Sequence, residues 1–214
     1  MYRFVYIPVF LLTILLASCT SCSDSKKKGI GEQKPVNPEV EKLDNTPDEA
    51  IFAHLDKYDN DSVYITLSGS REKKSYCYHE AVTTGRFHGS MTVGDDYSFF
   101  PDNRNKSISI AINTTELSGR WIYDEKKFRG FDFNGKGGMS SINNDDLCFR
   151  EWKLLNGKLY SYTVGVQDVA GDRHQYDVEE AEIYNLNKDN LTISFRGKQY
   201  TCHRPSSKPL LFKP

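Results

Sequence analysis

The sequence predicts an all-β protein whose second half closes into a small up-and-down antiparallel barrel. Many short segments are rich in β-branched and aromatic residues and are separated by turn residues. Two Asn-Gly pairs, Asn134-Gly135 and Asn156-Gly157, lie between such segments, which is the strongest short-range signal for a hairpin. The segments follow one another too closely to leave room for crossover helices, so a parallel sheet is disfavoured.

The N-terminus has the features of an export signal. After Met1-Tyr2-Arg3, an apolar run extends from Phe4 to Leu16, which is too short to span a bilayer but has the length of a signal-peptide core. Leu16-Ala17-Ser18-Cys19 resembles the bacterial lipobox. The resemblance implies a signal peptide at 1–18 and a lipid anchor, with palmitate among its acyl chains, at Cys19. Thr20, where a retention signal would have Asp, favours the outer membrane over the inner one.

This lipobox interpretation decides how the pair Cys19 and Cys22 is read. A lipidated Cys19 has no free thiol, so the spacing is not that of a redox or metal pair, and no second CxxC follows. We therefore expect the membrane to be a partner through Cys19, in the cell envelope, on either its periplasmic or its surface face.

Residues 19–46 are polar and contain Pro35 and Pro38, and they predict a disordered tether. The formal net charge of −1 and the lack of a long basic block argue against nucleic acid as a partner. The one basic run, Lys26-Lys27-Lys28, falls within the tether.

The segment 47–114 predicts a first β-domain. Thr46-Pro47 with Glu49 is compatible with a helix start. However, Ile51, Ala53 and Leu55 alternate with period two and lead into the turn residues 59–61, so we favour a hairpin. Further strands are expected in "SVYITLS", "KKSYCYH", "DYSFF" and "KSISIAIN", with a glycine turn at 93–95.

The segment 115–205 predicts the second barrel, followed by a tail at 206–214. Strands are expected in "GRWIYD", "FRGFDF", "GGMSSI", "FREWKLL", "KLYSYTV", "QYDVEEAEIYNL", "LTISFR" and "KQYTCHR". Alternation predicts that eight of their side chains face the barrel interior: Phe131, Phe133, Trp152, Leu154, Tyr160, Tyr162, Ile193 and Phe195.

The second half resembles the lipocalin-like domains of bacterial lipoproteins of the NlpE-like family. Thr115 to Arg204 carries the resemblance, most clearly in the G-x-W at Gly119-Arg120-Trp121, the "GGMSSIN" run and Trp152. Residues from about 50 to 114 resemble, more weakly, the OB-like barrel that accompanies such domains. The fold expected from this resemblance is an OB-like barrel followed by a lipocalin-like up-and-down barrel. The resemblance also implies a structural role for Gly119 and Trp121, with Trp121 packing across the barrel base, under Arg196 or Arg204.

Two main function hypotheses follow, neither of them enzymatic, and a third, more distant one is a secreted hydrolase. In the first, the chain binds a small apolar or amphipathic ligand or senses the state of the envelope. The proposed site lies inside the second barrel, with Trp152, Tyr160, Tyr162 and Phe133 as an apolar wall and Arg150 or Arg129 as a polar handle at its mouth. In the second, the barrels are solid scaffolds for an envelope protein partner, and exposed aromatics such as Tyr76, Tyr78 and Phe99 mark the contact surface.

Other motifs favour structural roles. Gly130-x4-Gly135-Lys136 lacks the Ser or Thr of a phosphate-binding loop and falls on a hairpin signal. Cys77 and His79, two apart on an expected strand, lack a visible third ligand, so we expect neither a metal nor another cofactor. A disulfide between Cys148 and Cys202 and a pair of free thiols both remain open. Catalytic motifs such as G-x-S-x-G and H-E-x-x-H are missing from the sequence.

Overall fold

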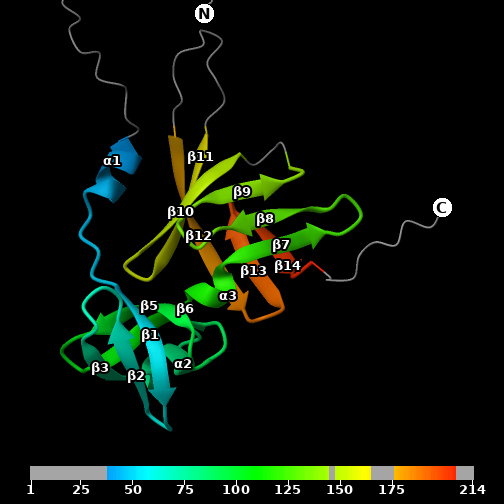
Figure 1. Ribbon diagram of the computed structural model, residues 1–214. Coiled ribbons are helices and arrows are strands. Elements are labelled where there is room, and N and C mark those ends of the chain that lie inside the picture. Colours follow the sequence, from blue (N-terminus) through cyan, green and yellow to red (C-terminus); the bar gives the residue numbers. More distant parts are fainter. Residues whose placement is uncertain (1–37, 145–147, 165–175, 206–214) are drawn as a thin grey trace, which may run out of the picture. The chain divides into compact units, whose positions relative to one another are not determined.

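The computed structural model describes residues 38–144, 148–164 and 176–205 (Figure 1). The predicted signal peptide, Cys19 and the tail lie outside these residues. Part of the predicted tether is helical, because Pro38–Asp44 form α1. No helix within the described ranges has the length and apolar character needed to cross a membrane.

The first sheet has six strands and closes on itself. Its strands are β1 (Ile51–Tyr58), β2 (Ser62–Leu67), β3 (Lys73–Cys77), β4 (Phe87–His88), β5 (Asp96–Asp102) and β6 (Ser107–Asn113). β1 to β3 form an antiparallel meander, β5 pairs with β1 and β6, and β3 meets β6 in parallel. The helix α2 (His79–Thr83) follows β3. The predicted hairpin at 51–67 is confirmed, with Asp59 accepting hydrogen bonds from the backbone of Asp61 and Ser62.

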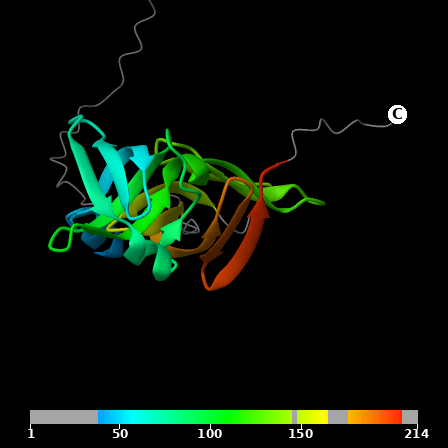
Figure 2. The ribbon, with the colours of Figure 1, turned by 90° about the horizontal axis from the view of Figure 1, so that it is seen from below.

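The second sheet has eight antiparallel strands in the order β10-β11-β12-β13-β14-β7-β8-β9. The short helix α3 (Thr114–Leu117) leads into it from β6. The strands are β7 (Gly119–Asp124), β8 (Arg129–Phe133), β9 (Met139–Ile142), β10 (Phe149–Leu155), β11 (Lys158–Val164), β12 (Tyr176–Leu186), β13 (Asn190–Phe195) and β14 (Lys198–His203). A single bridge between Gly138 and Glu151 joins the two ends of this order, so the barrel is nearly closed. Figures 1 and 2 show each sheet curling on itself, which confirms the predicted all-β barrel class.

Aromatic side chains fill the interior of the second barrel. Phe131 makes ring contacts with Phe149, Phe195 and Tyr200, with centroids 5.2 to 5.6 Å apart. Such tilted and edge-on pairs add to the burial energy of the rings. Leu154 and Ile193 belong to the same buried cluster, as alternation predicts.

Two of the eight predicted inward side chains face the other way. Tyr160 and Tyr162 pair with Lys153 and Glu151, whereas Leu159 pairs with the core residue Leu154. Since paired residues share a face of the sheet, both tyrosines lie on the outside of the barrel. The prediction was wrong because β11 places polar residues inward, Ser161 and Thr163 among them, so its alternation pointed to the wrong face.

The base of the second barrel is built as the G-x-W motif implies. Trp121 is fully buried and donates its indole N–H to the carbonyl of Leu117 at 2.8 Å. The guanidinium of Arg204 lies over the Trp121 ring, 3.7 Å from its centroid. Arg204 also donates hydrogen bonds to the carbonyls of Glu116 and Arg120. The cation–π contact is therefore present, and it is made by Arg204, the residue that follows β14, rather than by Arg196.

Candidate functional site

A hollow lies on the outside of the second barrel, and we call it the Trp152 groove. Its volume is about 770 Å³. It lies between the β8–β9 connection and the outer faces of β10 and β11, with the end of α1 beside it. Its lining residues are Asp44, Asn134, Lys136, Gly137, Gly138, Arg150, Glu151, Trp152, Lys153 and Tyr162.

One wall of the groove is the connection from β8 to β9. Asn134 and Gly135 do not form the predicted two-residue turn; they begin a five-residue loop in which Gly137 has φ +89°. The loop is held by the Lys136 N–H, which donates to Asn134 Oδ1 at 2.7 Å, and by the Trp152 N–H, which donates to the Gly137 carbonyl at 2.7 Å. Glycine is required beside β10, since a Cβ at Gly137 would lie 3.3 Å from the Trp152 carbonyl oxygen.

The opposite wall comes from β10, where a bulge changes the direction of the strand. The register against β11 shifts between Phe149 and Glu151, so Arg150 is the extra residue and its side chain is exposed. Trp152 returns to the interior, 9% exposed, and donates its indole N–H to the Asn134 carbonyl at 2.9 Å. The position of Trp152 is therefore fixed by core packing and by this hydrogen bond, beside the exposed side chain of Arg150.

Charges of both signs surround the groove. Lys153 Nζ lies 3.7 Å from Asp44 Oδ1, and the Tyr162 hydroxyl donates a hydrogen bond to the same oxygen at 3.3 Å. Burial, followed by the charge of Asp44, raises the pKa of Tyr162 to about 12, so its hydroxyl keeps its proton at neutral pH. The Asp44 carboxylate thus forms an ion pair with Lys153 and accepts a hydrogen bond from the Tyr162 hydroxyl.

The structure brings together three of the six predicted ligand-binding residues, namely Trp152, Tyr162 and Arg150. Phe133 lies behind Trp152 in the core, with ring centroids 5.9 Å apart. Tyr160 lines a separate hollow of about 430 Å³ near α1. Arg129 begins β8 and lines neither hollow.

The groove residues that the sequence reasoning missed are the loop Asn134–Gly138 and the cations Lys136 and Lys153. The glycine-rich run "NGKGG" could have indicated this loop. It does not match a phosphate-binding loop. The run nevertheless marks a place where backbone comes close to a neighbouring strand.

A second polar cluster faces the interior of the same barrel. Arg196 Nε lies 3.5 Å from Glu179 Oε2, and Arg196 Nη2 donates to Thr163 Oγ1 at 3.2 Å. Burial raises the pKa of Glu179, and the neighbouring Arg196 opposes that shift. Ser161 pairs with Glu179 across the strands, and its buried hydroxyl has no hydrogen-bond partner among the described residues.

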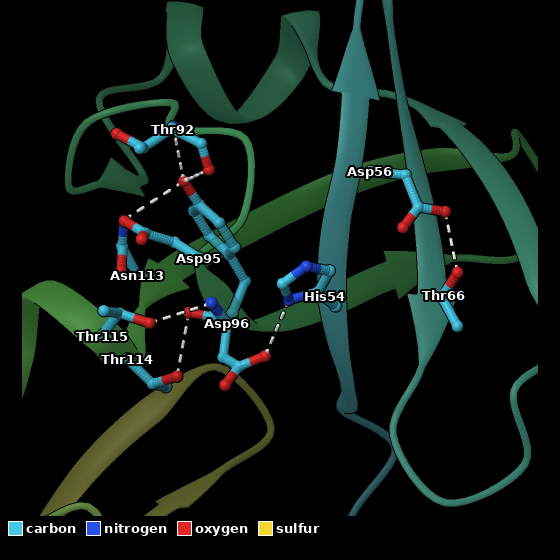
Figure 3. Close-up of polar contacts among 10 residues, drawn as sticks. His54, Asp56, Thr66, Thr92, Asp95, Asp96, Asn113, Thr114 and Thr115 are labelled. Carbon is cyan, nitrogen blue, oxygen red and sulfur yellow. Dashed lines mark hydrogen bonds and ion pairs between the residues drawn. The ribbon is translucent and has the colours of Figure 1, made fainter.

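A network in the first barrel is structural (Figure 3). The buried Tyr97 hydroxyl donates to the Ser90 carbonyl at 2.7 Å and accepts from the Thr92 N–H and from Asn113 Nδ2. Asn113 Nδ2 also donates to Asp95 Oδ2 at 2.8 Å. Burial raises the pKa of Tyr97 to about 12. The network therefore fixes the loop before β5 against the end of β6.

The surface part of the same view is a polar contact between the neighbouring strands β1 and β5. His54 Nδ1 lies 3.3 Å from Asp96 Oδ1, and both side chains are largely exposed (Figure 3). The backbone of Asp96 accepts from the Thr114 hydroxyl and donates to Thr115 Oγ1. These contacts connect β5 to the start of α3 and carry no geometry for catalysis.

The aromatics predicted to mark a contact surface are mostly buried. Phe99 is 0% and Tyr76 7% exposed, and both belong to the core of the first barrel. The prediction of exposure was wrong for these two because they lie on the inward face of β5 and β3. Tyr78 is partly buried, with its hydroxyl donating to the Asp59 and Asn60 carbonyls.

In the part of the chain that the structure describes, the cysteine and histidine side chains form no shared metal site. Cys77 ends β3 and His79 begins α2, so the expected shared strand face does not exist. Among the described residues, His, Cys, Asp and Glu form no group of three suited to a metal. Cys77 and Cys202 are free thiols, so Cys202 forms no disulfide with Cys148, and burial raises the pKa of Cys202 to about 12.

The second half of the chain matches a known family. Residues 113–204 match the family model described as lipocalin-like. The chain is also similar to a lipocalin-like protein from Bacteroides thetaiotaomicron whose crystal structure is known. The match covers 42% of this chain and 97% of that protein's chain, with 20% sequence identity and a TM-score of 0.35. No curated protein matches the sequence. The segment from residue 113 to residue 204 is thus a lipocalin-like domain.

Proposed function

We propose that this chain is a non-catalytic binding module that holds a small apolar or amphipathic molecule in the Trp152 groove. The observation that carries the proposal is that one hollow of about 770 Å³ gathers Trp152, Tyr162 and Arg150. This volume is in the range of small-molecule sites, and the lining combines two aromatic residues with several charged and polar ones. Lipocalin-like proteins are generally non-enzymatic binding proteins, which supports the same function.

The packing of the barrel supports an outer site over an inner one. Phe131, Phe149, Phe195 and Tyr200 contact one another inside the barrel and occupy the space that an enclosed ligand would need. An eight-stranded barrel is just wide enough either to be filled by side chains or to hold one small ligand. A ligand outside the barrel requires no displacement of this aromatic cluster.

The proposal extends to location. A lipid at Cys19 would anchor the module to the cell envelope, at the outer membrane, on either its periplasmic or its surface face. The support for it is the sequence Leu16-Ala17-Ser18-Cys19 behind an apolar run. Replacing Cys19 by Ser should abolish incorporation of labelled palmitate and move the protein from the membrane to the soluble fraction. Unchanged labelling of the variant would refute an anchor at this residue.

The names OB-like and NlpE-like also remain proposals. For the first barrel, the support is its connectivity. It has a β1-β2-β3 meander, a helix after β3 and β5 beside β1, and β6 pairs antiparallel with β5 and parallel with β3. This five-stranded closed order is compatible with an OB-like barrel. A sensing role of the NlpE kind rests on the resemblance of the lipocalin-like segment.

The test of the binding function is native mass spectrometry of the Ser23–Pro214 segment, purified gently from cells that contain envelope lipids. We expect an adduct that is lost on denaturation and is reduced in a Trp152→Phe variant, with Trp121→Phe as the control at the barrel base. A clean apo mass in every preparation would favour the alternative, a scaffold with solid barrels that contacts an envelope protein.

A further inference from the structure

Arg150 and Lys136 give the Trp152 groove a local charge that the rest of the groove does not neutralise. Three cationic side chains, Lys136, Arg150 and Lys153, line the groove against two carboxylates, Asp44 and Glu151. Lys153 and Asp44 form an ion pair with each other. The remaining balance is two cations against one carboxylate, so the groove attracts anions.

The two remaining cations have no carboxylate partner among the residues that the structure describes. No described Asp or Glu oxygen lies within 4 Å of the Arg150 guanidinium or the Lys136 ammonium. Both side chains are exposed, and they come from opposite walls of the groove. An anion between them would receive a charge-assisted hydrogen bond from each side.

Arg150 is placed by backbone structure rather than by strand alternation. As the extra residue of the bulge in β10, it is not paired with a residue of β11. A guanidinium presents a planar fork of donors that matches a carboxylate or phosphate. Bulges often serve to re-aim a side chain in this way.

The apolar part of the ligand has a defined counterpart. Trp152 faces the barrel interior and is 9% exposed, so only a small part of it lines the groove, and its indole N–H is already used by the Asn134 carbonyl. Tyr162, on the outer face of the sheet and 8% exposed, adds a small part of a second ring, and its hydroxyl is engaged by Asp44. A ligand with a flat apolar body and one anionic group therefore fits both halves of the site.

We infer that the Trp152 groove selects anionic ligands, with a carboxylate or phosphate held between Arg150 and Lys136 and an apolar body against Trp152 and Tyr162. This inference rests on the proposed function and names the ligand class for that site. Cationic molecules are disfavoured because Asp44 is engaged by Lys153 and Tyr162, and the remaining carboxylate, Glu151, is outnumbered by Lys136 and Arg150.

The test uses the full chain in a nonionic detergent and four probes that share one ring system: 1-naphthyl phosphate, 1-naphthoate, 1-naphthol and 1-naphthylmethylammonium. Binding is followed by the fluorescence anisotropy of the naphthalene. We expect at least one of the two anions to bind about tenfold more tightly than naphthol, with the ammonium weakest. The tighter of the two anions distinguishes a phosphate from a carboxylate ligand.

Variants assign the binding to the groove. Lys136→Gln combined with Arg150→Gln should weaken anion binding about tenfold and leave naphthol binding unchanged, because both side chains are exposed and contribute charge only. Arg104→Gln, an exposed arginine on the β5–β6 turn, is the matched control and should change neither. Circular dichroism checks that each variant is folded.

Three results would overturn the inference. Equal binding of naphthol and the anions would leave a groove that selects by apolar surface alone, and the proposed binding function would stand. Anion binding that the double variant does not weaken would place the anion elsewhere. Absence of binding by all four probes would count against the anionic ligand and the binding function together.

Discussion

The best-defined residue contact in the second barrel is between Arg204 and Trp121, and it closes the barrel base. The guanidinium stacks on a fully buried ring and donates to two carbonyl oxygens of the preceding segment. Gly119 makes this approach possible, since a Cβ there would lie 2.7 Å from Arg204 Nη1. One arginine therefore ties the end of β14 to the start of β7.

Replacing Arg204 by Ala should lower the free energy of unfolding by about 2–4 kcal/mol, because a cation–π contact and two charge-assisted hydrogen bonds are lost. Arg204→Lys should recover only part of the loss, since an ammonium lacks the planar fork. Urea unfolding measures both, with Arg104→Ala expected to stay within about 0.5 kcal/mol of the wild type. Wild-type stability in Arg204→Ala would contradict the structural role of this contact.

Among the elements, hairpins with left-handed turn residues organise the second barrel. Asn156 and Gly157 have φ of +52° and +75°, as a type I′ turn requires, and this turn was predicted from the sequence. Arg196 and Gly197 adopt the same pair of signs, at +51° and +68°. The second turn carries no Asn-Gly signal, and only its glycine indicates it.

Gly157→Ala tests what this turn contacts. Beyond the strain of a positive φ, a Cβ at Gly157 would lie 2.8 Å from Ile110 Cδ1 and 3.2 Å from Phe100 Cβ. Gly197→Ala has the strain without the overlap, since nothing lies within 4 Å of its Cβ. We expect a loss of about 1 kcal/mol for Gly197→Ala and about 2–4 kcal/mol for Gly157→Ala in urea unfolding. Equal losses would show that the packing of Ile110 is not strained.

Period-two patterns and turn residues were enough to predict most strands, because both depend on local sequence. Predictions that depend on which face of a strand is buried were less secure. In β11, from Leu159 to Thr163, the sequence pattern does not decide which face of the strand points inward. Tyr160 and Tyr162 are apolar enough for a core position, whereas Ser161 between them is polar. The tyrosines lie outside because Leu159 pairs with the core residue Leu154. The groove itself depends on a bulge at Arg150 and a glycine loop, which no period reveals.

At the scale of the whole molecule, the core of each barrel contains a buried group whose pKa is raised. Burial raises the pKa of Tyr97 in the first core and of Cys202 in the second to about 12, from ordinary values of 10.0 and 9.0. Tyr162, on the outer face of the second barrel, is raised to about 12 as well. Each of these groups keeps its proton in the folded chain at a pH where the unfolded chain has lost it.

Stability should therefore be complete below about pH 9 and fall as the pH rises from about 9 to 12, since deprotonation then favours the unfolded chain. Cys202→Ala should flatten the early part of this decline, and Tyr97→Phe the part above pH 10, although each variant is less stable at neutral pH. Urea midpoints at pH 8, 9, 10 and 11 measure the slope. Ile193→Val removes one buried methylene group and no titrating group, so it should lower stability by about 1 kcal/mol at every pH. A slope that neither Cys202→Ala nor Tyr97→Phe changes would mean that alkaline unfolding begins at other groups, outside these two cores.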